Sequence, residues 1–324
     1  MSNAIRIHET GGPEVLRWEE IEDRPPEPGE VRIRQTAVGL NFIDTYFRSG
    51  AYPLAKLPLI LGMEAAGVVE EVGEGVDDLA IGDRVTYVQG PGAYCEERVL
   101  SADRVLRLPE AITDEVAAAM MLKGMTAEYL VRRTYPVKAG DTILVQAAAG
   151  GVGLILCQWA KELGATVIGT VGSQEKADLA RAHGCDHPIL YREESFLDRV
   201  KELTDGRGVP VVYDSVGKDT FDDSLDCLAP RGLLALFGQS SGAVAAFNIP
   251  NLMAKGSLYL TRPSLAAYTT TRSDLEESAG ALFDVVERGV VRIEIRQRYA
   301  LRDAREAHED LEGRRTTGST VLLP

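Results

Sequence analysis

The amino-acid sequence predicts an α/β protein that combines a doubly wound parallel sheet with a second, β-rich domain. Between residues 142 and 238, short apolar runs alternate with helical segments, which is typical of a parallel sheet covered by helices. Residues 1–100 contain short strand-like runs separated by glycine and proline turns. That punctuation favours a small, irregular β-barrel-like domain.

The parallel sheet is expected to begin with a βαβ unit. Residues 142–147 and 166–171 are apolar, β-branched runs that predict two buried strands. Between them, apolar residues repeat at helical spacing over residues 154–163, and Gly164 is placed to end that helix.

A glycine-rich turn joins the first strand of this unit to its helix. Gly150 and Gly153 occupy the second and third glycine positions of the G-x-G-x-x-G fingerprint, whereas Ala148 stands at the first. Glycines leave room for a dinucleotide pyrophosphate at the helix N-terminus. The unit therefore predicts a dinucleotide site that departs from the fingerprint at one position.

The remaining elements follow from the same patterns. Asn41 is placed to cap a short helix that Gly50 ends. Residues 264–324 leave the alternating rhythm and are expected to complete the first domain, which gives domains of 1–122 with 264–324 and of 123–263. The predicted strands cover residues 4–7, 16–18, 31–34, 186–190, 209–214, 233–238 and 258–261, and the predicted helices cover residues 114–123, 125–133, 174–183, 195–204, 221–228 and 274–287.

Composition narrows the function classes. The net charge of −14 repels phosphate backbones, so nucleic acid is disfavoured as the main partner. No run of about 18 apolar residues is present to span a membrane. The four cysteines form no C-x-x-C motif, which suits a reducing compartment, and we expect a cytoplasmic protein.

The chain resembles the medium-chain dehydrogenase/reductase superfamily, and within it the NADPH:quinone oxidoreductases related to zeta-crystallin. The resemblance implies a GroES-like catalytic domain, a Rossmann domain and an active site in the cleft between them. It also implies a homodimer. The motifs that carry it lie at residues 11–16, 41–49, 62–67, 147–159, 212–217 and 256–264.

A zinc-independent reaction is expected. Met63 stands where the zinc alcohol dehydrogenases of this superfamily have a histidine, and a thioether is a poor zinc ligand. Cys95 is the only cysteine in its predicted domain, so the four clustered cysteines of a structural zinc site are missing. His183 and His187 flank a predicted helix end and turn, where we expect solvated side chains.

The resemblance places the catalytic residues near the predicted short helix: Asn41, Tyr46 and Tyr52 line the nicotinamide and substrate pocket, with Asp44 nearby. Asn41 would bond the substrate carbonyl or a cofactor ribose. Either tyrosine would polarise the carbonyl or relay a proton, although an unperturbed phenol is a weak acid. The alternative is that Asn41 only caps the helix and the tyrosines only pack.

NADPH is expected as the cofactor in preference to NADH. An NAD-specific enzyme has an acid at the end of its second strand, whereas Gly172 and Ser173 stand there in this chain. Lys176 is close enough to bind a 2′-phosphate, unless it is only an exposed helix lysine. The cofactor residues expected from the motif and the resemblance are Asn41, Tyr46, Thr126, Gly150, Gly151, Val152, Gly153, Gly172, Ser173, Lys176, Tyr191, Ser215, Phe237, Gly238, Ser240 and Arg314.

Two function classes remain open. The chain is either an enzyme that uses NADPH to reduce quinones, or the double bond of enals and enones, or a protein that binds NADPH without turnover, as lens and RNA-binding relatives do. Residues 257–261 predict a strand at the end of the sheet. Pairing with a second copy would satisfy its edge, unless the chain's own tail covers it.

Overall fold

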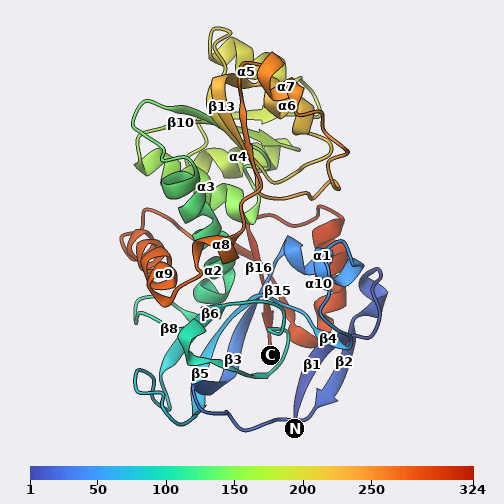
Figure 1. The fold of residues 1–324 in the computed structure, drawn as a ribbon, viewed down its shortest axis with the longest axis vertical. Coiled ribbons are helices and arrows are strands. Elements are labelled where there is room, and N and C mark those ends of the chain that lie inside the picture. The colour runs from blue at the N-terminus through green and yellow to red at the C-terminus, as the bar shows by residue number, and fades with distance from the viewer. The chain divides into compact units, whose positions relative to one another are not determined.

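The computed structural model describes all 324 residues and separates into two compact units (Figure 1). Unit 1 comprises Met1–Lys123, Thr271–Glu287 and Ile293–Pro324, and unit 2 comprises Gly124–Thr270 and Arg288–Arg292. The division falls within helix α2 (Asp114–Tyr129).

Unit 2 contains a six-stranded sheet in the order β11-β10-β9-β12-β13-β14. Every pairing in it is parallel, so the predicted doubly wound sheet is confirmed. Counted from β9, the order is 3-2-1-4-5-6, which is that of a dinucleotide-binding Rossmann fold with its switch point between β9 and β12. The strands are β9 (Thr142–Val145), β10 (Thr166–Val171), β11 (His187–Leu190), β12 (Val209–Asp214), β13 (Leu228–Leu236) and β14 (Tyr259–Thr261).

The longer helices of unit 2 pack against this sheet through buried apolar residues, whereas its two shortest helices, at Pro250–Ala254 and Leu265–Tyr268, bury no residue. Leu144, Ile168 and Val212 from three adjacent strands are fully buried, and Val200 and Leu225 from two helices join the same core. The helices are α3 (Gly151–Glu162), α4 (Gln174–Ala182), α5 (Phe196–Leu203), α6 (Phe221–Asp226), α7 (Pro250–Ala254) and α8 (Leu265–Tyr268).

Unit 1 is built around the long strand β3 (Glu30–Leu40). One edge of β3 pairs with β5 over most of its length. The other edge pairs with β7 at residues 30–34 and with β16 at residues 38–40, so the chain's C-terminus returns to this sheet. The sheet contains β5 (Glu64–Val72), β6 (Arg84–Val88), β7 (Glu97–Ser101), β8 (Val105–Arg107), β15 (Ile295–Ala300) and β16 (Ser319–Leu323).

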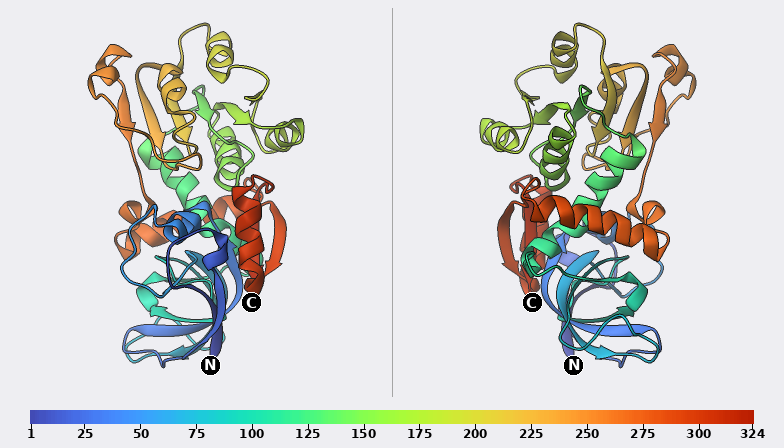
Figure 2. Two further views of the ribbon diagram at one scale, coloured as in Figure 1. Left: turned by 90° about the vertical axis from the view of Figure 1, so that its right-hand side faces the viewer. Right: turned by 90° about the vertical axis from the view of Figure 1, so that its left-hand side faces the viewer.

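A second, three-stranded sheet in the order β2-β1-β4 contributes Ile5 and Ile7 to the core of unit 1. Helix α10 lies alongside β15, as Figure 2 shows for the red C-terminal segment. These remaining elements are β1 (Ser2–Ile7), β2 (Arg17–Ile21), β4 (Leu59–Ile60), α1 (Phe42–Ser49), α9 (Arg272–Glu287), α10 (Ala304–Glu312) and the 3-10 turns Pro13–Val15, Ala102–Arg104 and Leu301–Asp303.

The prediction of two helices over residues 114–133 is wrong. Helix α2 runs through Gly124 without a break and ends in a π-helical turn at Leu130–Thr134. Glycine weakens an isolated helix, but Met120 and Met121 are fully buried and their packing outweighs that propensity.

The histidine prediction is half correct. His187 is exposed, but His183 is buried at the end of α4, where its Nδ1 lies 2.8 Å from the carbonyl oxygen of Leu179. The ring folds back onto the last turn of the helix, which sequence spacing alone does not reveal.

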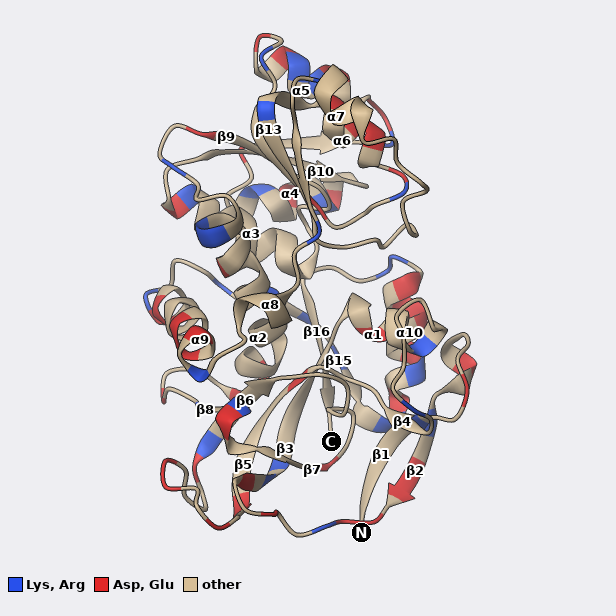
Figure 3. Ribbon diagram, in the orientation of Figure 1, with Lys and Arg blue, Asp and Glu red and all other residues tan.

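None of the helices has the length and apolar character that a membrane span requires. Figure 3 shows acidic and basic residues interspersed along the helices of both units.

Candidate cofactor and active site

The glycine-rich turn after β9 has the shape that a pyrophosphate requires. Ala147 has a φ of +55°, so the left-handed residue of the turn lies one position before Ala148, and Ala148 itself is fully buried. A Cβ on Gly153 would lie 2.4 Å from the carbonyl oxygen of Ala147, which only glycine avoids. Gly150 is the N-cap of α3, so no side chain caps the helix N-terminus.

A row of hydrogen-bonded polar side chains from β10, the end of β9 and α6 holds this turn. The Thr170 hydroxyl accepts a bond from the backbone N–H of Ala147 (3.1 Å) and donates to Oε1 of Gln146 (2.6 Å). Gln146 in turn donates to the hydroxyl of Ser224 (3.1 Å). All members are buried or nearly so, and buried networks of this kind fix one arrangement.

Asp214 organises the loop after β12. Its buried carboxylate accepts bonds from the backbone N–H groups of Val216 (2.7 Å) and Gly217 (3.0 Å) and from the hydroxyls of Thr220 and Ser224. Four donors around one carboxylate hold the intervening Ser215 in a fixed position.

The loop after β13 lies against the loop after β12. A Cβ on Gly238 would be 2.5 Å from the carbonyl oxygen of Ser215, so the two backbones touch. Arg262 secures the contact by donating to the carbonyl oxygens of Leu236 (2.9 Å) and Gly238 (2.7 Å). Glycine at 238 is therefore required by this close approach.

The residues expected to choose between NADPH and NADH surround the end of β10. Gly172 directly follows the strand, and Ser173 caps α4 by accepting from the backbone N–H of Lys176 (3.4 Å). The exposed Tyr191 places its hydroxyl 2.9 Å from where a Cβ on Gly172 would be. No carboxylate occupies this acid position.

The cofactor residues predicted within the Rossmann sheet therefore share one location, the segments that follow the carboxyl ends of its strands. Glycine cradles of this kind accommodate a dinucleotide, so the residues present fit the predicted cofactor. Thr126 lies in α2 and is nearly buried. The group comprises Gly150, Gly151, Val152, Gly153, Gly172, Ser173, Lys176, Tyr191, Ser215, Phe237, Gly238 and Ser240.

In unit 1, Asn41 caps α1 and Gly50 ends it in a left-handed conformation, as predicted. The Asn41 side chain also donates to Oε1 of Glu64 (2.7 Å). Glu64 is fully buried and accepts from the backbone N–H of Leu122 (2.5 Å), while Nζ of Lys123 lies 3.4 Å away. The cap is therefore tied to a buried ion pair.

The predicted tyrosines form a half-buried aromatic group on α1 and the loop that follows. The ring centroids of Tyr46 and Tyr52 are 5.1 Å apart. Phe42 lies 5.6 Å from Tyr46, and Phe47 lies 5.7 Å from Tyr52. These contacts bring two predicted site residues together and at the same time account for the packing alternative.

Asp44 is fully buried. One carboxylate oxygen accepts from the backbone N–H of Asn41 and from the hydroxyl of Tyr94, both at 2.8 Å, while the other has no partner. Burial raises the pKa of Asp44 to about 7, although the two donated bonds and Lys123 act in the opposite direction. Asp44 therefore changes charge near neutral pH.

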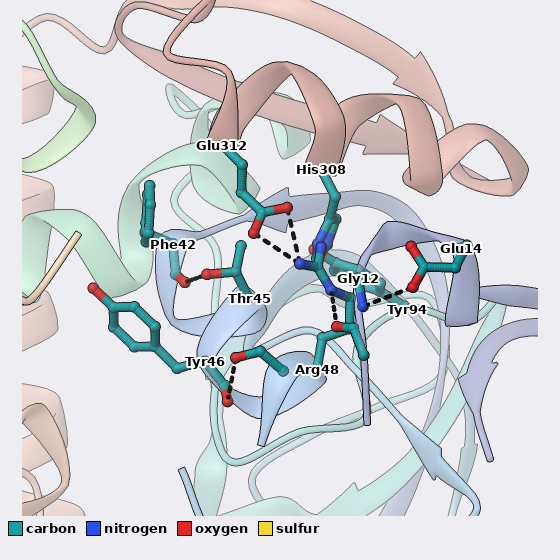
Figure 4. A network of polar contacts seen from close by, with 11 residues as sticks. Gly12, Glu14, Phe42, Thr45, Tyr46, Arg48, Tyr94, His308 and Glu312 are labelled. Carbon is teal, nitrogen blue, oxygen red and sulfur yellow. Dashed lines mark hydrogen bonds and ion pairs between the residues drawn. The ribbon is translucent and has the colours of Figure 1, made fainter. Parts of the chain in front are cut away.

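Tyr94 links Asp44 to a buried group on α10. Its oxygen lies 3.1 Å from Nε2 of His308, and Nδ1 of that ring lies 2.9 Å from Nη1 of Arg48. Arg48 also bonds both carboxylate oxygens of Glu312 at 2.8 Å, as Figure 4 shows. Burial lowers the pKa of His308 to about 3, with Arg48 as the second cause.

Sequence reasoning did not single out Glu64, Lys123, Tyr94, Arg48 or His308. Lys123 gave a usable signal, because it is the only charge in the Ala- and Met-rich run of residues 117–127. His308 gave none, since its partner Arg48 is 260 residues away in sequence.

Arg314, which was predicted to bind the cofactor, follows α10 in unit 1 and has a φ of +58°. No group of three or more metal-ligating side chains is present.

Known proteins resemble this arrangement over the whole chain. The alcohol dehydrogenase GroES-like domain family matches residues 27–139, and the zinc-binding dehydrogenase family matches residues 151–279. These matches confirm the predicted fold class.

Three relatives match this chain over nearly its full length. A quinone oxidoreductase of Pseudomonas aeruginosa is 56% identical, and a 2-haloacrylate reductase of Burkholderia is 48% identical; each alignment covers 100% of this chain and at least 99% of the relative. The crystal structure of an Escherichia coli quinone oxidoreductase complexed with NADPH is 51% identical, with a TM-score of 0.98 over 99% of this chain and 100% of that one. The chain therefore belongs to the quinone oxidoreductases of the medium-chain dehydrogenase/reductase superfamily.

Proposed function

We propose that this protein reduces quinones with NADPH. The observation that carries the proposal is the glycine cradle at the carboxyl edge of the sheet, formed by Gly150, Gly153 and Gly238. It leaves room for a pyrophosphate at the N-terminus of α3 and for close approach of the backbone at the switch point. The quinone oxidoreductase relatives supply the substrate class.

Each predicted cofactor residue has a role in this proposal. The turn of residues 150–153 binds the pyrophosphate through backbone N–H groups. Lys176 and Tyr191 bind the 2′-phosphate together with Ser173, and Arg314 supplements them. The loops that contain Ser215 and residues 237–240 line the nicotinamide side, with Thr126, Asn41 and Tyr46 completing the set.

The protein's own residues bind and orient the quinone. Bound NADPH supplies a hydride, and water can supply the proton because a quinone is an electron-poor acceptor. Asn41 donates to a substrate carbonyl or to a ribose, and Tyr46 and Tyr52 provide an aromatic surface with hydroxyl donors. Asp44 is fully buried and accepts a bond from the backbone N–H of Asn41, so we assign it a positioning role through Asn41.

NADPH oxidation in the presence of 1,4-benzoquinone tests the function directly. Gly150→Val should raise the KM for NADPH strongly, because its methyl groups would fill the cradle and its Cβ would crowd the carbonyl oxygen of Ala147 at 3.2 Å. Gly280→Val is the matched control, since a Cβ at Gly280 meets nothing within 4 Å. NADPH binding without oxidation would instead favour a non-enzymatic protein.

A second candidate activity is reduction of the double bond of enals and enones. It is favoured by the 48% identity to the 2-haloacrylate reductase of Burkholderia, whose name indicates an activated double bond as substrate. A panel of quinones and enones at equal concentration separates the two activities. A higher kcat/KM for the enones would replace quinone reduction as the main function.

We also propose a homodimer that forms through β14. This strand ends the sheet and pairs only with β13, which leaves its other edge available. Tyr259 in β14 is 62% exposed, and Ile249 and Met253 near it in sequence are 69% and 73% exposed. Large exposed apolar side chains beside an edge strand are typical of an interface.

The domain division that we propose assigns residues 1–122 and 264–324 to the GroES-like catalytic domain and residues 123–263 to the cofactor-binding domain. It differs from the compact units chiefly at residues 264–270 and 288–292, which belong to unit 2. We further propose that the protein works in the cytoplasm, because all four of its cysteines are free and buried. Fractionation of the source cells would test this location.

A further inference from the structure

We propose that Tyr94 and His308 are positioning residues which, through Asp44, fix the start of α1 at Asn41 and make the reaction depend on pH near neutrality. This inference deepens the proposed function and rests on the role of Asn41 in it. Its members come from three separate segments: α1, the loop before β7, and α10.

The direction of the hydrogen bonds in this chain is fixed at one end. Arg48 has only donors, so Nδ1 of His308 must accept the bond from it. A neutral imidazole then carries its proton on Nε2, which donates to the oxygen of Tyr94. The hydroxyl proton of Tyr94 is left to donate to Asp44.

His308 keeps this tautomer over a wide pH range. Its ring is fully buried beside the guanidinium of Arg48, and both effects hold its pKa at about 3. A second proton on the ring would place two cations in contact without solvent. The polarity of the chain therefore does not reverse at physiological pH.

This series of hydrogen bonds does not conduct protons to the site. Arg48 connects His308 to the half-exposed Glu312, but its guanidinium does not release a proton in proteins. Protons therefore cannot pass from Glu312 to His308. The arrangement therefore orients Asp44 and is not a path from solvent.

Asp44 connects the Tyr94–His308 hydrogen bonds to Asn41. Its carboxylate holds the Asn41 backbone N–H, while Glu64 holds the Asn41 side chain. Hydrogen bonds to a charged acceptor are roughly twice as strong as neutral ones, so protonation of Asp44 loosens the cap. The charged and titratable groups around Asp44 are Arg48 on its own helix, Tyr94, His308 and Glu312, and Glu64 and Lys123.

The pH profile of kcat/KM for benzoquinone reduction tests this positioning role. Wild type should lose rate below about pH 7 in a single step, where Asp44 takes up a proton. Tyr94→Phe removes a donor to the carboxylate, which should move the step up by about one pH unit and lower the rate at pH 7 by about fivefold. Asp44→Asn should remove the step altogether.

Two further variants separate positioning from general damage. His308→Gln keeps an acceptor for Arg48 and a donor for Tyr94, so it should restore a step near that of wild type, whereas His308→Leu should move it upward. Tyr87→Phe removes a buried hydroxyl that bonds Gln35 outside this chain, and should leave the step in place. A step that stays at the same pH in Tyr94→Phe, or survives in Asp44→Asn, overturns the inference.

A measurement without substrate distinguishes this inference from the proposed function. The protein contains only four asparagines, so selective ¹⁵N-asparagine labelling resolves the Asn41 amide. Its NMR signal should titrate near pH 7 in wild type and not in Asp44→Asn. If it titrates while quinones are not reduced, only the proposed function fails; if it does not titrate, the positioning chain fails whatever the substrate.

Discussion

Gly172 lies beneath the hydroxyl of Tyr191, and a Cβ at residue 172 would be 2.9 Å from that oxygen. The hydroxyl thus faces the position at which NAD-specific enzymes have an acid. We expect Gly172→Asp to lower kcat/KM for NADPH at least about tenfold relative to NADH, because a carboxylate there would repel a 2′-phosphate. Initial rates with each cofactor measure the ratio.

The matched control for this change is Gly172→Asn, which has the same shape without the charge. It must displace the Tyr191 hydroxyl as the aspartate does, so any steric loss appears in both variants. If the cofactor ratio changes equally in the two variants, crowding and not charge is responsible, and the assignment of Gly172 to the phosphate side fails.

Lys176 provides a second test of the cofactor preference. Hydrogen bonds to charged groups contribute about 1.5–3 kcal/mol, so Lys176→Ala should raise the KM for NADPH roughly tenfold or more and leave that for NADH unchanged. Arg181→Ala on the same helix is the control, since Arg181 pairs with Asp178. An unaltered NADPH to NADH ratio in Lys176→Ala would clear Lys176 of this role.

The Rossmann part of the fold could be predicted from sequence because its signals are local. The strands and helix from β9 to β10 depend on residues close together in the chain. The same is true of the cap at Asn41 in unit 1. The left-handed turn residue was less accessible, because Ala147 is held by Thr170, 23 positions away. The G-x-G-x-x-G spacing instead puts its first glycine position at Ala148.

The buried polar groups of unit 1 could not be predicted for the same reason. Asp44, Tyr94 and His308 meet only after three distant segments have packed together, and their altered pKa values arise from that burial. Asp44 could be found through its motif, but its charge state could not. The family resemblance identified Asp44 as a site residue, whereas its raised pKa follows from how it packs in the folded protein.

We expect activity to be independent of zinc. Met63 occupies the position of a ligand histidine, and no group of three or more metal-ligating side chains is present. Purified protein should contain no stoichiometric zinc, and EDTA should leave the rate of quinone reduction unchanged. A loss of rate on chelation that added zinc restores would contradict this prediction.

The proposed dimer is best tested at Tyr259. Leu258 in the predicted edge strand is only 6% exposed and packs in the core of unit 2, so its replacement by lysine would disturb the fold. Tyr259→Lys places a charge on the exposed edge and should convert the dimer to a monomer in light scattering. Ile81→Lys, at an exposed apolar residue of unit 1, should leave the mass unchanged. A wild-type monomer at micromolar concentration would rule the interface out.

Asp44 and His308 should give the free energy of unfolding opposite dependences on pH. Folding raises the pKa of Asp44 from 3.8 to about 7, so its contribution to stability is full below pH 4 and is lost as pH rises to 7. Folding lowers that of His308 from 6.5 to about 3, so its contribution is full above pH 6.5 and is lost as pH falls to 3. In wild type the two slopes offset each other between pH 4 and 6.5.

Single variants expose each slope. Asp44→Asn leaves the histidine, and its midpoint of urea unfolding should rise from pH 4 to 6.5. His308→Gln leaves the aspartate, and its midpoint should fall over the same range. Each group corresponds to about 1.4 kcal/mol per pH unit, a difference that urea titrations at three pH values resolve. If both variants keep the pH dependence of wild type, neither group has the shifted pKa that burial implies, and the expected change of charge at Asp44 is lost with it.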